Sequence, residues 1–144
     1  MKSRLATIFM FALAGCATQP KALQNADETC VLRHSSGEIA SINRLPVSLR
    51  KLVRTNFGEM ADRGEYFNSG DVVVKPGPFN RYMRAGKIGE RWYLWFEHGG
   101  IAYWREIVLL ALDSSGTAHV IAEEHAQPGQ NLCAMTVALD AATL

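Results

Sequence analysis

The sequence predicts an α+β domain in which one main helix packs on an antiparallel β-meander of about five to six strands. Three observations lead to this prediction. Residues 46–60 carry one helical stripe of apolar side chains, residues 79–139 hold a series of strand-like segments separated by turns, and residues 90–113 contain all three tryptophans. A helix with one apolar face must bury that face, and the aromatic sheet that follows it offers the surface.

The predicted helix runs from Pro46 to about Met60. Proline suits a first helical position, where its missing N–H is no loss, and Gly64 is a plausible stop. The apolar side chains recur three or four residues apart, which is the helical spacing. They are Leu49, Leu52, Val53, Phe57 and Met60.

Two long strands, 91–97 and 101–112, are predicted to form a central hairpin that reverses at residues 97–100. In the first strand Trp92, Leu94 and Phe96 alternate with Tyr93 and Trp95, whereas the second strand is apolar on nearly every residue. Apolar side chains on both faces predict a sheet that is covered on both sides.

The remaining elements are shorter. Turn-forming residues bound each of them, and the segment 75–78 contains two prolines, which cannot donate to a strand ladder. The predicted strands are residues 29–33, 72–74, 79–86, 117–124 and 132–139, with a turn at 34–37. The order of one helix followed by a meander is loosely similar to small cystatin-like and envelope-lipoprotein folds.

The N-terminus has the pattern of an export signal. Lys2 and Arg4 precede an apolar run, residues 5–14, which is too short to span a bilayer as a stable helix. The run ends in Leu13-Ala14-Gly15-Cys16, which resembles the lipobox of bacterial lipoprotein precursors. The alternative is an ordinary secretory signal with a chance cysteine near its cleavage site.

The lipobox resemblance implies that Cys16 receives a diacylglycerol, becomes the mature N-terminus and carries further acyl chains such as palmitate. Ala17, rather than Asp, follows it. In Gram-negative lipoproteins this implies an outer-membrane location facing the periplasm. We therefore expect a signal peptide at residues 1–15, a flexible tether at 16–28 and a single domain at 29–144.

Charge and cysteine content agree with an exported protein. Without Lys2 and Arg4 the chain keeps 13 basic and 14 acidic residues, so it lacks the basic excess of a nucleic-acid partner. Cys30 and Cys133 remain as an even pair, which predicts a disulfide in an oxidising compartment. The alternative is two free thiols packed as small apolar side chains.

No motif predicts an enzyme, a metal site or a cofactor. Ser48 and Lys51 match the S-x-x-K pattern of penicillin-binding proteins, but the accompanying S-D-N and K-T-G signals are absent. The histidines show no H-E-x-x-H spacing, and solvated turn residues are the more common interpretation. They are His34, His98, His119 and His125.

The predicted function is non-enzymatic: a membrane-anchored lipoprotein that binds another envelope component through its sheet. The candidate interaction surface is Tyr93, Trp95, Tyr103 and Arg105, unless the helix and the linked termini cover these rings. The alternative is a small-ligand-binding or accessory module with an apolar cleft formed by a curved sheet. Arg105-Glu106 interrupts the apolar strand, so these charges either pair at the sheet rim or lie at the floor of such a cleft.

Overall fold

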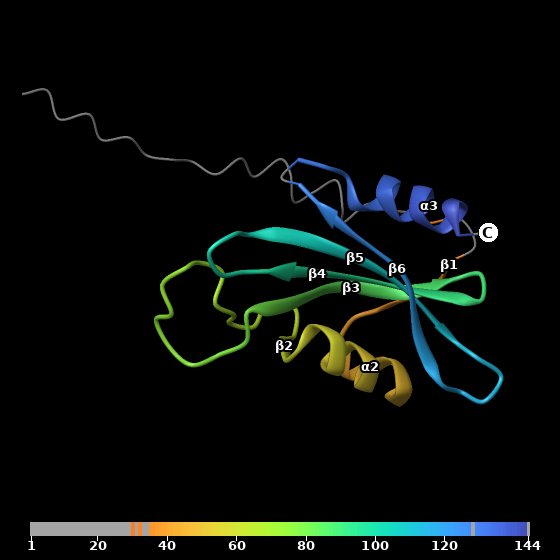
Figure 1. The fold of residues 1–144 in the computed structure, drawn as a ribbon, viewed down its shortest axis with the longest axis horizontal. Coiled ribbons are helices and arrows are strands. Elements are labelled where there is room, and N and C mark those ends of the chain that lie inside the picture. The colour runs from red at the N-terminus through yellow and green to blue at the C-terminus, as the bar shows by residue number, and fades with distance from the viewer. Residues whose placement is uncertain (1–29, 31, 33–34, 128, 144) are drawn as a thin grey trace, which may run out of the picture.

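The computed structural model describes Cys30, Leu32 and residues 35–127 and 129–143. The lipobox, Cys16, the tether and His34 lie outside the described residues. Within them the chain forms an α+β fold, with an antiparallel meander in the order β1-β3-β4-β5-β6 and two helices (Figure 1).

The connections between the elements are short, except for the loop of residues 62–79 between β2 and β3. The strands are β1 (Ser35–Ile39), β2 (Met60–Ala61), β3 (Asn80–Ile88), β4 (Arg91–His98), β5 (Trp104–Leu112) and β6 (Ala118–Ala126). The helices are a 3-10 turn (Ile42–Arg44), α2 (Val47–Phe57) and α3 (Leu132–Ala142). The two-residue β2 pairs parallel with β3, beside the meander.

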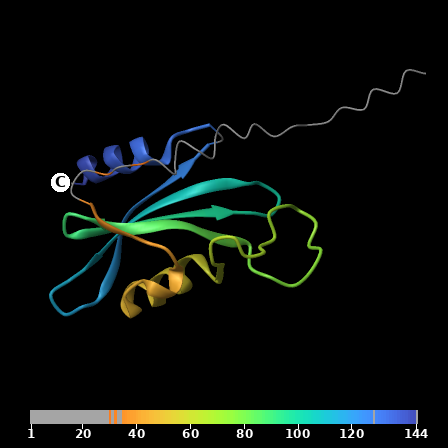
Figure 2. The same cartoon turned by 180° about the vertical axis from the view of Figure 1, so that it is seen from behind.

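The two helices lie on opposite faces of the sheet, and the view from behind shows the same three layers (Figure 2). Under α2 the core contains Leu49 and Val53 of the helix with Leu94 and Val108 of the sheet. Under α3 it contains Tyr93, Trp95 and Ile107. The predicted alternation in the first strand of the central hairpin is therefore confirmed, and both faces of the sheet are covered.

The predicted helix is confirmed in type and apolar face, but it is shorter than predicted. Pro46 lies at the N-cap position, and α2 ends at Phe57 because Gly58 follows with a φ of 81°. That left-handed conformation favours glycine. Met60 consequently belongs to β2 rather than to the helix.

The prediction of a last strand at 132–139 was wrong, because this segment is most of α3. Asn131 caps the helix through its side chain, which accepts from the N–H of Ala134 at 3.0 Å. Leu132 and Thr136 are buried one turn apart, and Leu139 packs beside them. The alanine-rich composition favours a helix, although the same residues alternate in a way that resembles a strand.

Three other predicted strands differ from the structure. Cys30 and Leu32 are buried but lie outside any strand, and β1 occupies the segment predicted as a turn. Residues 72–74 form no strand and lie in an exposed part of the loop between β2 and β3. Residues 101–103 belong to the loop between β4 and β5.

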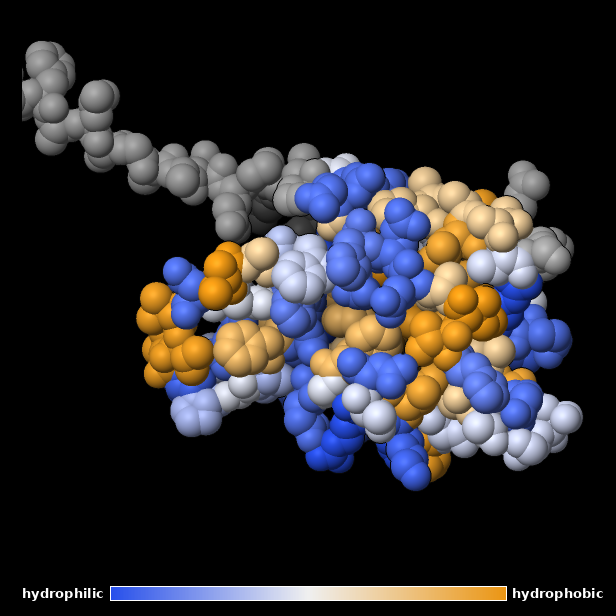
Figure 3. Space-filling view, viewed as in Figure 1, coloured by the Kyte–Doolittle hydropathy of each residue, from blue (hydrophilic) through white to orange (hydrophobic). Residues whose placement is uncertain are grey.

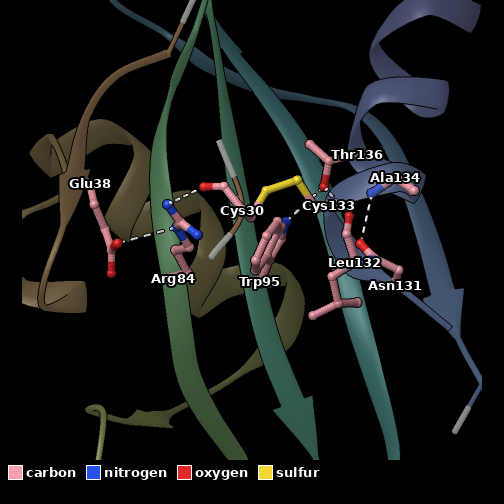
Figure 4. Close-up of a disulfide and its surroundings, with 9 residues drawn as sticks. All are labelled: Cys30, Glu38, Arg84, Trp95, Asn131, Leu132, Cys133, Ala134 and Thr136. Carbon is pink, nitrogen blue, oxygen red and sulfur yellow. Dashed lines mark hydrogen bonds and ion pairs between the residues drawn. A yellow bond between two sulfur atoms is a disulfide. The ribbon is translucent and has the colours of Figure 1, made fainter. Parts of the chain in front are cut away.

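The predicted disulfide is present in the structure. Cys30 and Cys133 are bonded, with their Cα atoms 5.6 Å apart, and they close a sequence separation of 103 residues (Figure 4). Nearby, Trp95 donates from Nε1 to the Oγ1 of Thr136 at 2.8 Å. The disulfide and this hydrogen bond fix α3 and the Cys30 segment over the ring of Trp95.

Candidate functional site

A row of polar and aromatic side chains crosses the sheet on the face that α2 covers. Register places Asn80 opposite His98, and His98 opposite Trp104. The next row places Phe96 opposite Glu106, and Glu106 opposite His125. Side chains that are directly opposite on one face lie about 5 Å apart, so these residues form one continuous surface.

Helix α2 reaches only the edge of this surface, where Phe57 packs on Phe96 with ring centroids 5.2 Å apart. Its 11 residues correspond to about 16 Å, whereas the nine residues of β5 reach about 30 Å. The uncovered part of the sheet and the end of the helix border an open cleft of about 640 Å³. Its lining consists of Thr55, Asn56, Phe57, Asn80, Phe96, His98, Trp104, Glu106, Glu123 and His125.

The carboxylate of Glu106 is buried in the wall of the cleft, with 5% of the residue exposed. Trp104 donates from Nε1 to its Oε2 at 2.9 Å, and His125 Nε2 lies 3.1 Å from its Oε1. A buried carboxylate requires such partners, because burial without hydrogen bonds is costly. The two ring nitrogens therefore fix the orientation of the carboxylate.

His98 is held in one orientation by two neighbours. Its ring stacks on Trp104 with centroids 4.0 Å apart, and its Nδ1 lies 2.6 Å from Oδ1 of Asn80. Asn80 donates from Nδ2 to the carbonyl of Phe57, which leaves its Oδ1 as an acceptor. We therefore assign the proton of neutral His98 to Nδ1 and a free lone pair to Nε2.

Burial lowers the pKa of His98, which outweighs the opposing effect of the nearby Glu106. The proximity of His125 lowers the pKa of His98 further. An imidazole with a lowered pKa is neutral at pH 7. The cleft then contains the neutral ring of His98 near the carboxylate of Glu106.

The structure separates the four residues of the predicted interaction surface. Tyr93 and Trp95 are 2% and 1% exposed, because α3 and the Cys30 segment cover them. Tyr103 is exposed in the loop between β4 and β5 and donates to Oε1 of Glu97 at 2.7 Å. Arg105 donates to the carbonyl of Gln130, so it contacts the segment that leads into α3.

The sequence contained a partial signal for the cleft. The sequence left open whether Arg105-Glu106 pairs at the sheet rim or lies at a cleft floor, and the structure places Glu106 in the cleft wall. His98 and His125 were interpreted as solvated turn residues, although they lie in strands beside Trp104. The missing information was the cross-strand register.

The geometry limits the chemistry of the described part of the chain. No three His, Cys, Asp or Glu side chains among these residues are placed to hold a metal ion. No helix within the same residues has the length and apolar character needed to cross a membrane. Ser48 and Lys51 are exposed on α2 and do not line the cleft.

Comparison of the chain with protein-family models, with curated proteins and with solved structures gave no match.

Proposed function

We propose that this chain is a lipid-anchored protein of the bacterial cell envelope whose folded domain binds a small ligand in the cleft beside Glu106. The observation that carries the proposal is a buried, oriented carboxylate in a cleft of about 640 Å³ lined by rings and amides. Small-molecule sites commonly have volumes of about 300–1,000 Å³ and a few fixed polar groups.

The envelope location is supported by two separate features. The lipobox ends in Cys16, and a disulfide joins Cys30 to Cys133, which is typical of exported proteins. Two or three acyl chains hold a protein durably on a membrane, whereas one gives marginal binding. With Ala17 after the cysteine, we propose an outer-membrane location facing the periplasm in a Gram-negative cell.

Metabolic labelling with palmitate tests the anchor. We expect the label on the wild-type chain and its loss in Cys16→Ser, because the acyl chains attach to this residue. Ser3→Ala, also in the signal region, serves as a control that keeps the label. Persistent labelling of Cys16→Ser would exclude the anchor.

We propose binding rather than catalysis because the lining offers few reactive groups. Thr55 supplies the one hydroxyl side chain among the lining residues, and neither serine nor cysteine is among them. Both oxygens of Glu106 already have ring nitrogens as partners. This arrangement suits recognition of a ligand better than formation of a covalent intermediate.

A fragment screen with a cleft-filling variant tests the binding site. Trp104 has an indole N–H in the cleft, and its NMR signal can be assigned by its loss in Trp104→Phe. We expect some fragments to shift this signal in the wild-type chain but not in Thr55→Trp, where the new ring occupies the cleft. Lys51→Trp, one turn earlier on α2, is the matched control, and equal responses in both variants would reject the site.

A second candidate function is the binding of another envelope protein. It is supported by exposed apolar side chains at one end of the molecule. Val72, Val74 and Ile101 are 71%, 82% and 97% exposed. Figure 3 shows apolar side chains gathered at the end formed by the loop between β2 and β3. An apolar patch of this kind is typical of a protein contact.

Site-specific photocrosslinking in intact cells tests the second candidate. We expect a photoreactive residue at Val74 or Ile101 to capture one defined protein. Val137, half exposed on α3, provides the control position. Identical crosslinks from all three positions would show that the loops have no dedicated partner.

A further inference from the structure

The acidic side chains of the cleft lining suggest the sign of charge that a ligand would carry. Glu106 and Glu123 are its two carboxylates, and no lysine or arginine is among the lining residues. Arg54 and Arg81 lie on flanking elements but pair with Glu59 and Glu97, at positions outside the lining. Among the lining residues, the two carboxylates therefore have neither lysine nor arginine beside them.

The end of α2 adds to this negative potential. Thr55, Asn56 and Phe57 form the last turn of the helix and border the cleft. The carbonyl end of a helix carries about half a negative charge, which attracts cations. The only basic residue in this turn, Arg54, pairs with Glu59.

Aromatic rings and one free acceptor complete the surroundings. Phe57, Phe96 and Trp104 line the cleft, and the faces of such rings attract cations. The lone pair on Nε2 of His98 provides an acceptor for an N–H donor. Carboxylates, a helix carbonyl end and aromatic rings all favour the same sign of ligand charge.

We infer that the cleft binds a small organic ligand through a positively charged ammonium group. The inference rests on the proposed function, since it names the ligand class of the same cleft. Glu106 and Glu123 supply the charge that attracts the ammonium group, and the rings contact its methyl or methylene groups. An anionic ligand is disfavoured, because no lysine or arginine in the lining would compensate its charge.

Three probes of nearly equal shape and different charge test the inference. They are choline, its neutral carbon analogue 3,3-dimethyl-1-butanol, and the anion 3,3-dimethylbutanoate. Each is titrated at pH 7 into the full-length chain in a non-ionic detergent, with the Trp104 indole signal as readout. We expect choline to bind about tenfold more tightly than the alcohol, and the anion not to bind.

Matched variants assign the effect to the cleft. Glu123→Gln should weaken choline binding about threefold or more, because it removes one carboxylate from an exposed lining position. Glu124→Gln should leave binding unchanged. Glu124 lies opposite Ile107 in the β5–β6 ladder and does not line the cleft. Glu106→Gln should weaken choline binding further. If Glu106→Gln does not fold, the comparison of Glu123→Gln with the wild type remains the test.

The outcomes separate the two proposals. If the alcohol binds as tightly as choline, or Glu124→Gln has the same effect as Glu123→Gln, the ammonium inference is overturned and the cleft remains a binding site. If neutral fragments shift the Trp104 signal and choline does not, the ammonium inference is likewise overturned and the cleft remains a binding site. If neither the probes nor the fragment library shifts this signal, both proposals fail.

Discussion

The indole of Trp104 donates a hydrogen bond of 2.9 Å to the carboxylate of Glu106, two residues further along β5. The two side chains share a face because neighbours in a strand alternate. This contact joins the aromatic and the charged part of the cleft, so changes at Trp104 affect both.

Replacing Trp95 and Trp104 by alanine should reduce the free energy of unfolding by unequal amounts. Trp95 is 1% exposed, whereas Trp104 is half-buried. We expect Trp95→Ala to reduce the free energy of unfolding by about 3–5 kcal/mol and Trp104→Ala by clearly less. Urea denaturation at pH 7 measures both, and a larger loss for Trp104→Ala would contradict this assignment of burial.

A glycine in the loop between β4 and β5 has no room for a side chain. A Cβ atom on Gly99 would lie 2.0 Å from the carbonyl oxygen of Asn68, which is backbone and cannot rotate away. We expect Gly99→Ala to lower the free energy of unfolding by about 1–3 kcal/mol.

Gly70 provides the matched control for this substitution. It lies in the facing loop with nothing within 4 Å of its added Cβ, and its φ is not positive. Gly70→Ala should therefore be close to neutral. Similar stabilities for the two variants in the same thermal melt would show that the loops do not touch at Gly99.

The lowered pKa of His98 gives stability a defined pH dependence. Burial favours the neutral ring in the folded state, so the unfolded chain binds a proton at a higher pH than the folded chain. Stability contributed by neutral His98 is complete above the unfolded pKa of about 6.5 and decreases as the pH falls below it.

Two measurements check this sign. The ring proton of His98 should titrate by NMR below the usual histidine range. The loss of unfolding free energy between pH 7 and pH 5 should be smaller in His98→Gln, which retains a polar side chain but does not titrate. An equal loss in the variant and the wild type would assign the acid effect to other groups.

The disulfide should contribute strongly to stability. It closes a separation of 103 residues, for which the chain-entropy model gives an upper value of about 4–5 kcal/mol. Mass mapping without reductant should find Cys30 joined to Cys133. The double variant Cys30→Ala/Cys133→Ala should melt at a lower temperature, and reductant should affect the wild type but not this variant.

The sequence predicted those parts of the fold that depend on local periodicity. The spacing of Leu49 and Val53 identifies the buried face of α2, and the alternation from Trp92 to Phe96 identifies two covered faces. In α3 two periodicities coincide, since Leu132 and Thr136 are one helical turn apart and also lie on one face of a strand. The capping side chain of Asn131 is the signal in the sequence that distinguishes the helix from a strand here.

The cleft could not be predicted because it depends on register and on the length of a helix. A bulge at Leu109/Leu110 leaves Ile121 as an extra residue in β6. Val120 and Glu123 would point to opposite faces of a regular strand, yet Val120 packs in the core under α2 and Glu123 lines the cleft. Sequence alternation alone does not reveal such a shift.

The covalent link between Cys30 and Cys133 also determines how the domain responds to mechanical load. Tension applied to the chain ahead of Cys30 passes through the sulfur atoms to Cys133, the second residue of α3. Strand β1, at the edge of the sheet, therefore carries only part of that tension. The rest is carried by α3 and its contact with Trp95.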